Sequence, residues 1–436
     1  MRSFRDWQRR DLLLIGLPSA VALVAALWIA ARFLQPAPPR HVIMATGVAG
    51  GGYAEFGARY AQILARHGIT LELHETEGSV ENVRLLGDAK SGVQVALVQS
   101  GIGSPETTPG LVSLGSVAYE PLWVFCRGPQ RLDDLGQLRG RRLAIGPPGS
   151  GTHELSLGLL AANEIDADAV TAVHATGIDG AEILLRDVVD CLFAIAAPEA
   201  GLVKALVQVP GLTLMHFPTA DAYLRRLPYL TKVTLPTGVF DLVQRMPPRD
   251  IDLLAATAEL VTREDLHPAI QTLLIQAATE IHGGSGLFQR RGEFPAPRQL
   301  GLPIADGAQR FYRSGPPFLQ RYLPFWVANL VDRAIVVLIP LVAVLFPLSR
   351  VIPPIYRWRV RSRIYRWYGE LMFIENETRS RITAGEKRDF SARLDAIEAT
   401  VNGQHPPLAY ADQLYALRQH IDFVREKLAR ATIGHE

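Results

Sequence analysis

The sequence predicts an α/β fold in which two lobes face each other across a cleft. Segments typical of strands alternate with segments typical of helices over residues 41–283, which favours a mostly parallel, doubly wound sheet. The segments at the start and end of this region together form one expected lobe, and the segment between them forms the other. Three of the strand-to-helix turns are rich in glycine, which allows a ligand to approach the backbone closely.

The first two strand–turn–helix units define the expected ligand edge of the sheet. The first strand ends in the glycines at 50–52, and a helix follows from about Tyr53. A second strand, 70–76, ends in the turn 77–79, and a helix follows from about Val80. Each helix start offers unpaired N–H groups and the positive end of a dipole. Two such starts on one face predict a site for an anion or polar ligand.

The remaining elements continue the same alternation. Further strands are expected at 93–100, 116–127, 141–146, 169–176, 190–197, 212–218 and 251–263. Further helices are expected from about 152 to 164, from Asp179, from Pro198 and over 267–283. The apolar run 116–127 is long enough to pass between the two lobes.

A third glycine-rich turn, Gly146 to Thr152, is similar to a phosphate loop but lacks its chemistry. GxxxxGK[ST] requires a lysine after the last glycine, whereas Thr152 and His153 follow Gly151. Residues 47–52 do not form GxGxxG, and no GxSxG or HExxH motif occurs. The sequence therefore predicts no catalytic residues, no metal site and no cofactor. The third turn is either a capped helix start or a ligand-lining turn.

Two hydrophobic segments predict a membrane-anchored protein. Leu12 to Ala31 is twenty residues without a charge, which is long enough to cross a bilayer. A retained signal anchor is favoured over a cleaved signal peptide, because prolines follow where cleavage would occur. The second segment, 325–348, is interrupted by Asp332 and Arg333 but is also long enough to span; the alternative is a buried soluble helix.

The charge distribution predicts the orientation and excludes one class of partner. Arginines crowd residues 2–10 and 350–366, and cytoplasmic flanks carry such an excess, so both termini are expected in the cytoplasm and the binding domain outside, at the inner membrane. A formal net charge of +2 argues against a nucleic-acid-binding protein. The expected organisation is a cytoplasmic N-terminus (1–11), a transmembrane anchor (12–32), a two-lobe binding domain (41–283, second lobe roughly 128–235), a stalk (284–324), a second transmembrane helix (325–348) and a cytoplasmic helical tail (349–436).

Two smaller features leave alternatives open. Cys126 and Cys191 lie in apolar strand-like runs, where a disulfide is permitted outside the cytoplasm and buried free thiols fit equally well. Segments 365–382 and 409–431 carry apolar residues at helical spacing, which predicts an α-hairpin in the tail. That hairpin is either an interaction module or a solvated juxtamembrane structure.

Polar residues at the turns and at one strand end are the candidate ligand contacts. Tyr53 is placed to stack on or hydrogen-bond a ligand, or to be a half-buried core aromatic. Asn82 lies in the first turn of the second helix, where its amide can point into the cleft. Gln99 and Ser100 end a strand, at the carboxyl edge where open α/β sheets bind ligands.

Together these segments resemble the TAXI family of extracytoplasmic solute-binding proteins, which is associated with TRAP-type transporters. The matching segments are ATGVAGGGYAEFG (45–57), EGSVENVRLL (77–86), VALVQSG (95–101), EPLWVF (120–125) and GPPGSGT (146–152). The segment around the second hydrophobic run is similar to that of a membrane-anchored subset. The resemblance implies a type II periplasmic-binding-protein fold and a small carboxylate ligand such as glutamate or an oxo-acid. Three glycine-rich helix starts without a nucleophile, base or metal set predict a solute-binding protein that is not an enzyme.

The resemblance also implies which residues line the ligand and what the protein does. The implied ligand-lining positions are Gly52, Tyr53, Ser79, Asn82, Gln99, Ser100, Ser150, Gly151 and Thr152. The implied function is capture of a small solute for TRAP-type membrane subunits. The alternative is a ligand sensor that signals through the helical tail.

Overall fold

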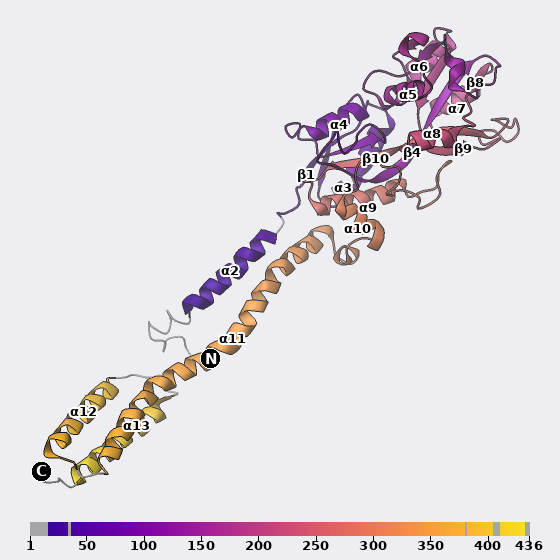
Figure 1. Ribbon diagram of the computed structural model, residues 1–436. Coiled ribbons are helices and arrows are strands. Elements are labelled where there is room, and N and C mark those ends of the chain that lie inside the picture. Colours follow the sequence, from indigo (N-terminus) through magenta and orange to yellow (C-terminus); the bar gives the residue numbers. More distant parts are fainter. Residues whose placement is uncertain (1–15, 34–35, 380–381, 404–409, 432–436) are drawn as a thin grey trace. The chain divides into compact units, whose positions relative to one another are not determined.

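The computed structural model describes residues 16–33, 36–379, 382–403 and 410–431, which fall into two compact units (Figure 1). Residues 36–329 form one unit, called the α/β unit below. The described residues of 1–35 and 330–436 form the other, called the helical unit. The expected cytoplasmic N-terminus (1–11), residues 12–15 of the expected anchor, and residues 380–381, 404–409 and 432–436 of the tail lie outside the described part.

The α/β unit is built on strands in the order β2-β1-β3-β10-β4-β7-β5-β6, with β8 paired to β4 and β9 paired to β10. The strands are β1 (His41–Ala45), β2 (Thr70–His74), β3 (Val95–Gln99), β4 (Leu111–Arg127), β5 (Arg142–Ala144), β6 (Thr171–Val173), β7 (Cys191–Ile195), β8 (Leu212–Leu214), β9 (Thr231–Leu235) and β10 (Ile251–Arg263). The predicted α/β fold is therefore confirmed. The expectation of a mostly parallel sheet needs one correction, because the two longest strands, β4 and β10, run antiparallel to their neighbours.

Strands β4 and β10 hold the two parts of the sheet together. They pair with each other from Ala255↔Pro121 to Arg263↔Leu111. Their outer neighbours on one side are β3, β1 and β2, and on the other side β4 continues into pairing with β7, followed by β5 and β6. Two groups of parallel strands are thus joined by two crossing strands. The sequence predicted this crossing for the run at 116–127 but not for the strand at 251–263.

Helices cover both parts of the sheet. They are α3 (Gly52–Arg66), α4 (Ser79–Gly87), α5 (Gly151–Ala162), α6 (Gly177–Leu185), α7 (Gly201–Val207), α8 (Ala220–Arg226), α9 (Pro268–His282) and α10 (Asp306–Ser314), with short 3-10 turns at Leu135–Leu138, Ala167–Ala169 and Phe318–Arg321. Helices α3 and α9 lie side by side (Figure 1), and their buried Tyr60, Leu64, Ile270 and Leu274 share one core. Packing of that core fixes the start of α3, where the first glycine turn lies.

Residues 284–324, expected to form a stalk, instead pack onto the α/β unit. Ser116 on β4 exchanges backbone hydrogen bonds with Ala296, and the N–H of Ser113 donates to Pro303. Ala308 of α10 is fully buried, and the Tyr312 hydroxyl donates to the Leu114 carbonyl at 2.8 Å. The sequence suggested a stalk because prolines and glycines break its periodicity, but its backbone groups find partners on the sheet.

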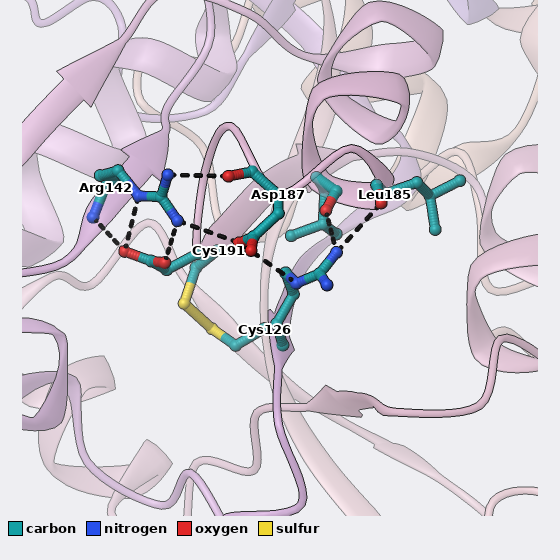
Figure 2. Close-up of polar contacts among 8 residues, drawn as sticks. Cys126, Arg142, Leu185, Asp187 and Cys191 are labelled. Carbon is teal, nitrogen blue, oxygen red and sulfur yellow. Dashed lines mark hydrogen bonds and ion pairs between the residues drawn. A yellow bond between two sulfur atoms is a disulfide. The ribbon is translucent and has the colours of Figure 1, made fainter.

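Cys126 and Cys191 form a disulfide between directly opposite residues of β4 and β7, with a Cα–Cα separation of 4.1 Å (Figure 2). Ion pairs lie beside it. The Arg142 guanidinium contacts the Asp190 carboxylate at 2.7 Å and that of Asp187 at 3.0 Å. The neighbouring Arg127 donates to the carbonyls at the end of α6, a position where a cation is favourable to the helix dipole. Of the two alternatives left open for the cysteines, the structure has the bridge.

The helical unit has its own core. It contains α2 (Leu17–Phe33), most of α11 (Phe325–Glu377), α12 (Ala384–Asn402) and α13 (Ala411–Arg430). The end of α11 packs with α12 and α13 through buried Leu371, Leu394 and Leu417, and Arg425 of α13 bonds to Glu398 of α12 at 2.6 Å. The predicted hairpin is therefore a three-helix arrangement. Helix α12 was not predicted, although its buried Phe390, Leu394, Ile397 and Val401 follow helical spacing.

Helix α11 is 53 residues long and does not end at residue 348, where the predicted span ended. By length and composition it can cross a membrane, and its most apolar stretch is not buried in the protein. Among the described residues, α2 is a shorter apolar helix that does not reach the same length. Helix α11 begins at the α/β unit, where Trp326 donates from its indole Nε1 to the His67 carbonyl at 2.7 Å.

Candidate functional site

A cleft of about 790 Å³ opens in the α/β unit where the two parallel groups of strands end. Its size suits a small molecule. Its first wall comes from residues within 47–56 and 77–79 and from Gln99; its second wall comes from residues 150–152, 176–177 and within 194–202. Ala118, Tyr119 and Glu120 of β4 form its floor.

Five helices of the α/β unit begin at this cleft, the shortest being α7, whose first residue is Gly201. The first residues of α3, α4, α5 and α6 are Gly52, Ser79, Gly151 and Gly177, and all four line the cavity. Their first-turn N–H groups and dipole ends therefore lie around one space, which favours a negatively charged or strongly polar ligand group. Of these five helices, α5 is the one with a side-chain cap, from Ser150.

The turn before α4 shows why glycine is required at the cleft. Gly78 has φ 135° and ψ −155°, a conformation that residues with a Cβ rarely adopt. This conformation carries the chain from the strand β2 into the helix start at Ser79. A Cβ on Gly78 would also contact the backbone of Gly149 and Ser150 across the cleft.

Tyr53 and Glu120 form the main side-chain pair of the cleft. The Tyr53 hydroxyl donates to Oε2 of Glu120 at 3.1 Å. Burial raises the pKa of the Glu120 carboxyl to about 7, although the hydrogen bond from Tyr53 acts in the opposite direction. Burial, followed by the charge of Glu120, raises the pKa of the Tyr53 phenol well above its usual value, so Tyr53 stays neutral and acts as a donor.

Ser79 and Gln99 connect the first wall to its neighbours. The backbone N–H of Gln99 donates to Oγ of Ser79 at 2.9 Å. A hydrogen bond from the Ser79 side chain acts against the rise in the pKa of the Tyr53 phenol. The Gln99 side chain crosses to the second wall, where Nε2 donates to the Gly151 carbonyl at 3.1 Å. A Cβ on Gly151 would clash with this amide, so glycine there allows the two walls to approach.

Two of the predicted ligand contacts, Asn82 and Ser100, do not line the cleft. Asn82 is fully buried; its Nδ2 donates to the carbonyls of Thr46 at 2.6 Å and Leu97 at 2.8 Å, and its Oδ1 accepts from Thr76. Ser100 accepts from the N–H of Thr257. Both side chains therefore join backbone segments behind the first wall. Sequence position alone could not show which side of α4 faces the sheet.

The structure brings the other predicted contacts together and adds residues that the sequence did not single out. Gly52, Tyr53, Ser79, Gln99, Ser150, Gly151 and Thr152 line the same cleft. The additions include Glu120, Tyr119 and Thr176. A signal for Glu120 was present in the sequence, because it is the one charged residue in the otherwise apolar run 116–126.

The charge of the cleft lining is entirely acidic. Glu55, Glu77, Glu120 and Glu199 line it, whereas the described lining includes no Lys, Arg or His. Positive potential therefore comes from helix starts, and negative potential from carboxyl groups. Over the described residues, no group of three or more His, Cys, Asp or Glu is arranged to hold a metal ion.

Residues 44–314 match the sequence model of the NMT1-like family, which includes both walls and the floor of the cleft. The chain belongs to the NMT1-like family. This match covers well over half of the chain, from the end of β1 to the end of α10.

Solved structures with similar folds are distant. The periplasmic aliphatic sulphonate-binding protein SsuA of Escherichia coli is 12% identical, with a TM-score of 0.34, over 74% of this chain and 93% of that one. A putative periplasmic sulfonate-binding protein SsuA of Methylobacillus flagellatus is 14% identical, with a TM-score of 0.33, over 55% of this chain and 67% of that one. A mutant of OxyR from Corynebacterium glutamicum is 14% identical, with a TM-score of 0.35, over 64% and 78%. Likenesses at this level say nothing about the ligand of this chain.

Proposed function

We propose that this chain is a membrane-anchored, extracytoplasmic solute-binding protein that captures a small carboxylate-bearing solute for a TRAP-type transporter. The observation that carries the proposal is the cleft into which α3, α4, α5 and α6 all begin. Backbone N–H groups at helix starts donate hydrogen bonds to carboxylate oxygens. Membership of the NMT1-like family and the TAXI resemblance support the same function.

Closure of the two walls provides the capture step. The walls are joined by β4 and β10, so a small rotation of these strands changes the width of the cleft. The hydrogen bond from Gln99 to Gly151 already joins the walls at one edge. A solute that contacts both walls favours the closed state by its difference in affinity for the two states.

Helix α11 supports the membrane anchor. Its apolar stretch is long enough to span a bilayer, and its internal prolines, such as Pro340 and Pro347, are tolerated in transmembrane helices. Helix α2 supplies the first span together with residues before it. In this arrangement both spans cross the inner membrane, the α/β unit is outside, and both termini are in the cytoplasm.

Thermal unfolding of the purified full chain in detergent tests solute binding. A ligand that binds only the folded state stabilises it by about 2.7 kcal/mol at a hundred times its Kd. We expect at least one member of a library of small carboxylates to raise the Tm of the α/β unit. Gly284→Ala, at a position with open space outside the cleft, is the control that should respond equally. The absence of any shift, together with turnover of a library compound, would contradict the proposal.

Signalling is the second candidate, and the core of the helical unit is the observation that favours it. Helices α11, α12 and α13 pack around their own apolar residues, which a simple tether does not need. Truncation after Arg350 removes this core and keeps the apolar part of α11. Solute uptake that survives truncation supports transport. Uptake that never depended on this chain, with ligand-dependent capture of a cytoplasmic partner by the tail, supports the sensor.

A further inference from the structure

The carboxyl group of Glu120 lies on the floor of the cleft without a cationic partner. Oε2 accepts a hydrogen bond from the Tyr53 hydroxyl at 3.1 Å. Among the described residues, Tyr53 is the one whose side chain forms a hydrogen bond with this carboxyl group. The described lining holds no Lys, Arg or His that could neutralise it. A partly buried carboxylate without a counter-charge is costly. A ligand cation removes that cost.

We propose that Glu120 receives an ammonium group of the bound solute, so that the cleft selects a small zwitterion over the corresponding acid without an amine. This inference rests on the proposed function and narrows its ligand class. The carboxylate of the solute lies at the helix starts, and its amine lies at the floor. Tyr53, Phe56 and Tyr119 also line the cleft, and aromatic rings attract cations.

Tyr53 is the positioning residue of this site. Its hydroxyl donates to Oε2 of Glu120, whose side chain belongs to the lining of the cleft. Its phenol does not ionise in the neutral range, since burial raises its pKa. The hydrogen bond therefore favours the carboxylate form of Glu120, which is the form that binds an ammonium group.

The opposite arrangement, in which a protonated Glu120 donates to a ligand carboxylate, gives the opposite pH dependence. The pKa of Glu120 in the free protein is about 7. Binding of an ammonium group requires the ionised form, so affinity should rise about tenfold from pH ~6 to pH ~8. It should then level off until the solute amine loses its proton. Binding through a protonated Glu120 should instead weaken over the same interval.

Other titratable groups near the site have to be separated from Glu120. Glu55, Glu77 and Glu199 line the cleft, and Tyr119 keeps its proton because its pKa is raised to about 12. Glu259 of β10 is buried, accepts from the N–H of Gly301, and has a pKa raised by burial to about 7. A pH effect that comes from Glu120 disappears in Glu120→Gln, whereas an effect of Glu259 remains.

Calorimetric titration of the full chain in detergent with matched pairs of ligands tests the inference. The probes are L-glutamate against 2-oxoglutarate, L-alanine against pyruvate, and L-leucine against 4-methyl-2-oxopentanoate. In the wild type we expect one amino acid to bind at least about tenfold more tightly than its oxo partner. In Glu120→Gln that preference and the rise with pH should both be lost, while affinity for the oxo-acid changes less than about threefold. Glu120→Asp, which keeps a carboxylate, should retain the preference for the amine.

Each outcome has one meaning for the inference. An oxo-acid that binds as tightly as its amino acid, or full amino-acid affinity in Glu120→Gln, overturns the role of Glu120 and leaves solute binding intact. Wild-type protein that binds none of the six probes and no other carboxylate overturns the proposed function together with the inference. Thermal unfolding of both variants without ligand checks that the fold is unchanged.

Discussion

The two walls of the cleft recognise a solute by different means. The first wall carries Tyr53, Ser79 and Gln99. The Tyr53 hydroxyl donates to Glu120 on the floor, and Oγ of Ser79 accepts from the backbone N–H of Gln99. The second wall, at 150–152, 176–177 and within 194–202, carries mostly small side chains and presents its backbone. The difference indicates that side-chain selectivity lies on the first wall and floor, while the second wall closes over the solute.

This division follows from how each wall is supported. Behind the first wall, Asn82 joins β1, β3 and the turn after β2, so the positions of its side chains are fixed from within the unit. The second wall is supported by the disulfide-linked β4 and β7 and by glycines at its helix starts. Ordered side chains give selectivity, whereas bare backbone allows close approach.

Asn82→Ala should have the largest effect, and the effect should be on stability. It leaves two buried carbonyls and the Thr76 hydroxyl without their partner, which should cost about 3 kcal/mol of unfolding free energy. Urea unfolding of the full chain measures this change. Arg84→Ala, on the exposed side of the same helix, should change stability by less than about 0.5 kcal/mol. Equal effects of the two variants would show that the first wall is not supported through Asn82.

Gly151→Val should block closure from the second wall. A Cβ at this position meets the Gln99 amide, and two further methyl groups cannot be accommodated when the walls approach. Solute affinity should fall by about a hundredfold, or about 2.7 kcal/mol, with the fold retained. Calorimetric titration measures the affinity, with Gly284→Ala as the control in open space. Unchanged affinity would place the solute away from the edge where Gln99 meets Gly151.

Tyr53→Phe removes one hydroxyl and so tests whether the first wall contributes to selectivity through its side chains. Glu120 then loses its hydrogen-bond donor, which raises its pKa further and reduces the fraction that is ionised at neutral pH. We expect affinity for an amino acid to fall about tenfold, or about 1.4 kcal/mol, and the pH at half-maximal affinity to move upward. A matched loss for the oxo-acid would show that the phenol contacts the solute directly instead.

Ser150→Ala should have the smallest effect. Oγ of Ser150 accepts from the N–H of His153 and caps α5, and such a cap is worth about 1 kcal/mol of stability. Solute affinity should be nearly unchanged, since the second wall is expected to use backbone N–H groups. A drop in affinity larger than the loss of stability would assign a direct contact to the Ser150 side chain.

Local patterns predicted the backbone of the site well. Glycine-rich turns and helix starts identified Gly52, Ser79 and Gly151 at the cleft, and the strand at 251–263 agrees with β10. These features depend on residues close together in the sequence. The disulfide stayed open because it depends on the register of β4 against β7, which places Cys126 opposite Cys191.

Long-range packing explains what the sequence did not show. Glu120 lines the cleft because β4 crosses beneath it, which depends on the long-range arrangement of the sheet. Asn82 does not line the cleft, because its side of α4 faces the sheet. The segment 284–324 has no periodicity of its own, yet Tyr312 and Ala308 are held by the sheet and by α9. Helix α12 is different, because the helical spacing of its buried Phe390, Leu394, Ile397 and Val401 could have predicted it from the sequence.

Native mass spectrometry of the full chain, released from detergent, tests most directly whether the cleft holds a zwitterionic solute. The account predicts one small molecule per chain, bearing both an amine and a carboxylate, whose occupancy falls in Glu120→Gln and is absent in Gly151→Val. Gly284→Ala should carry the molecule as the wild type does. A bound molecule with no amine, retained fully by Glu120→Gln, would contradict the assignment of the floor. A molecule retained by Gly151→Val would contradict the assignment of the cleft.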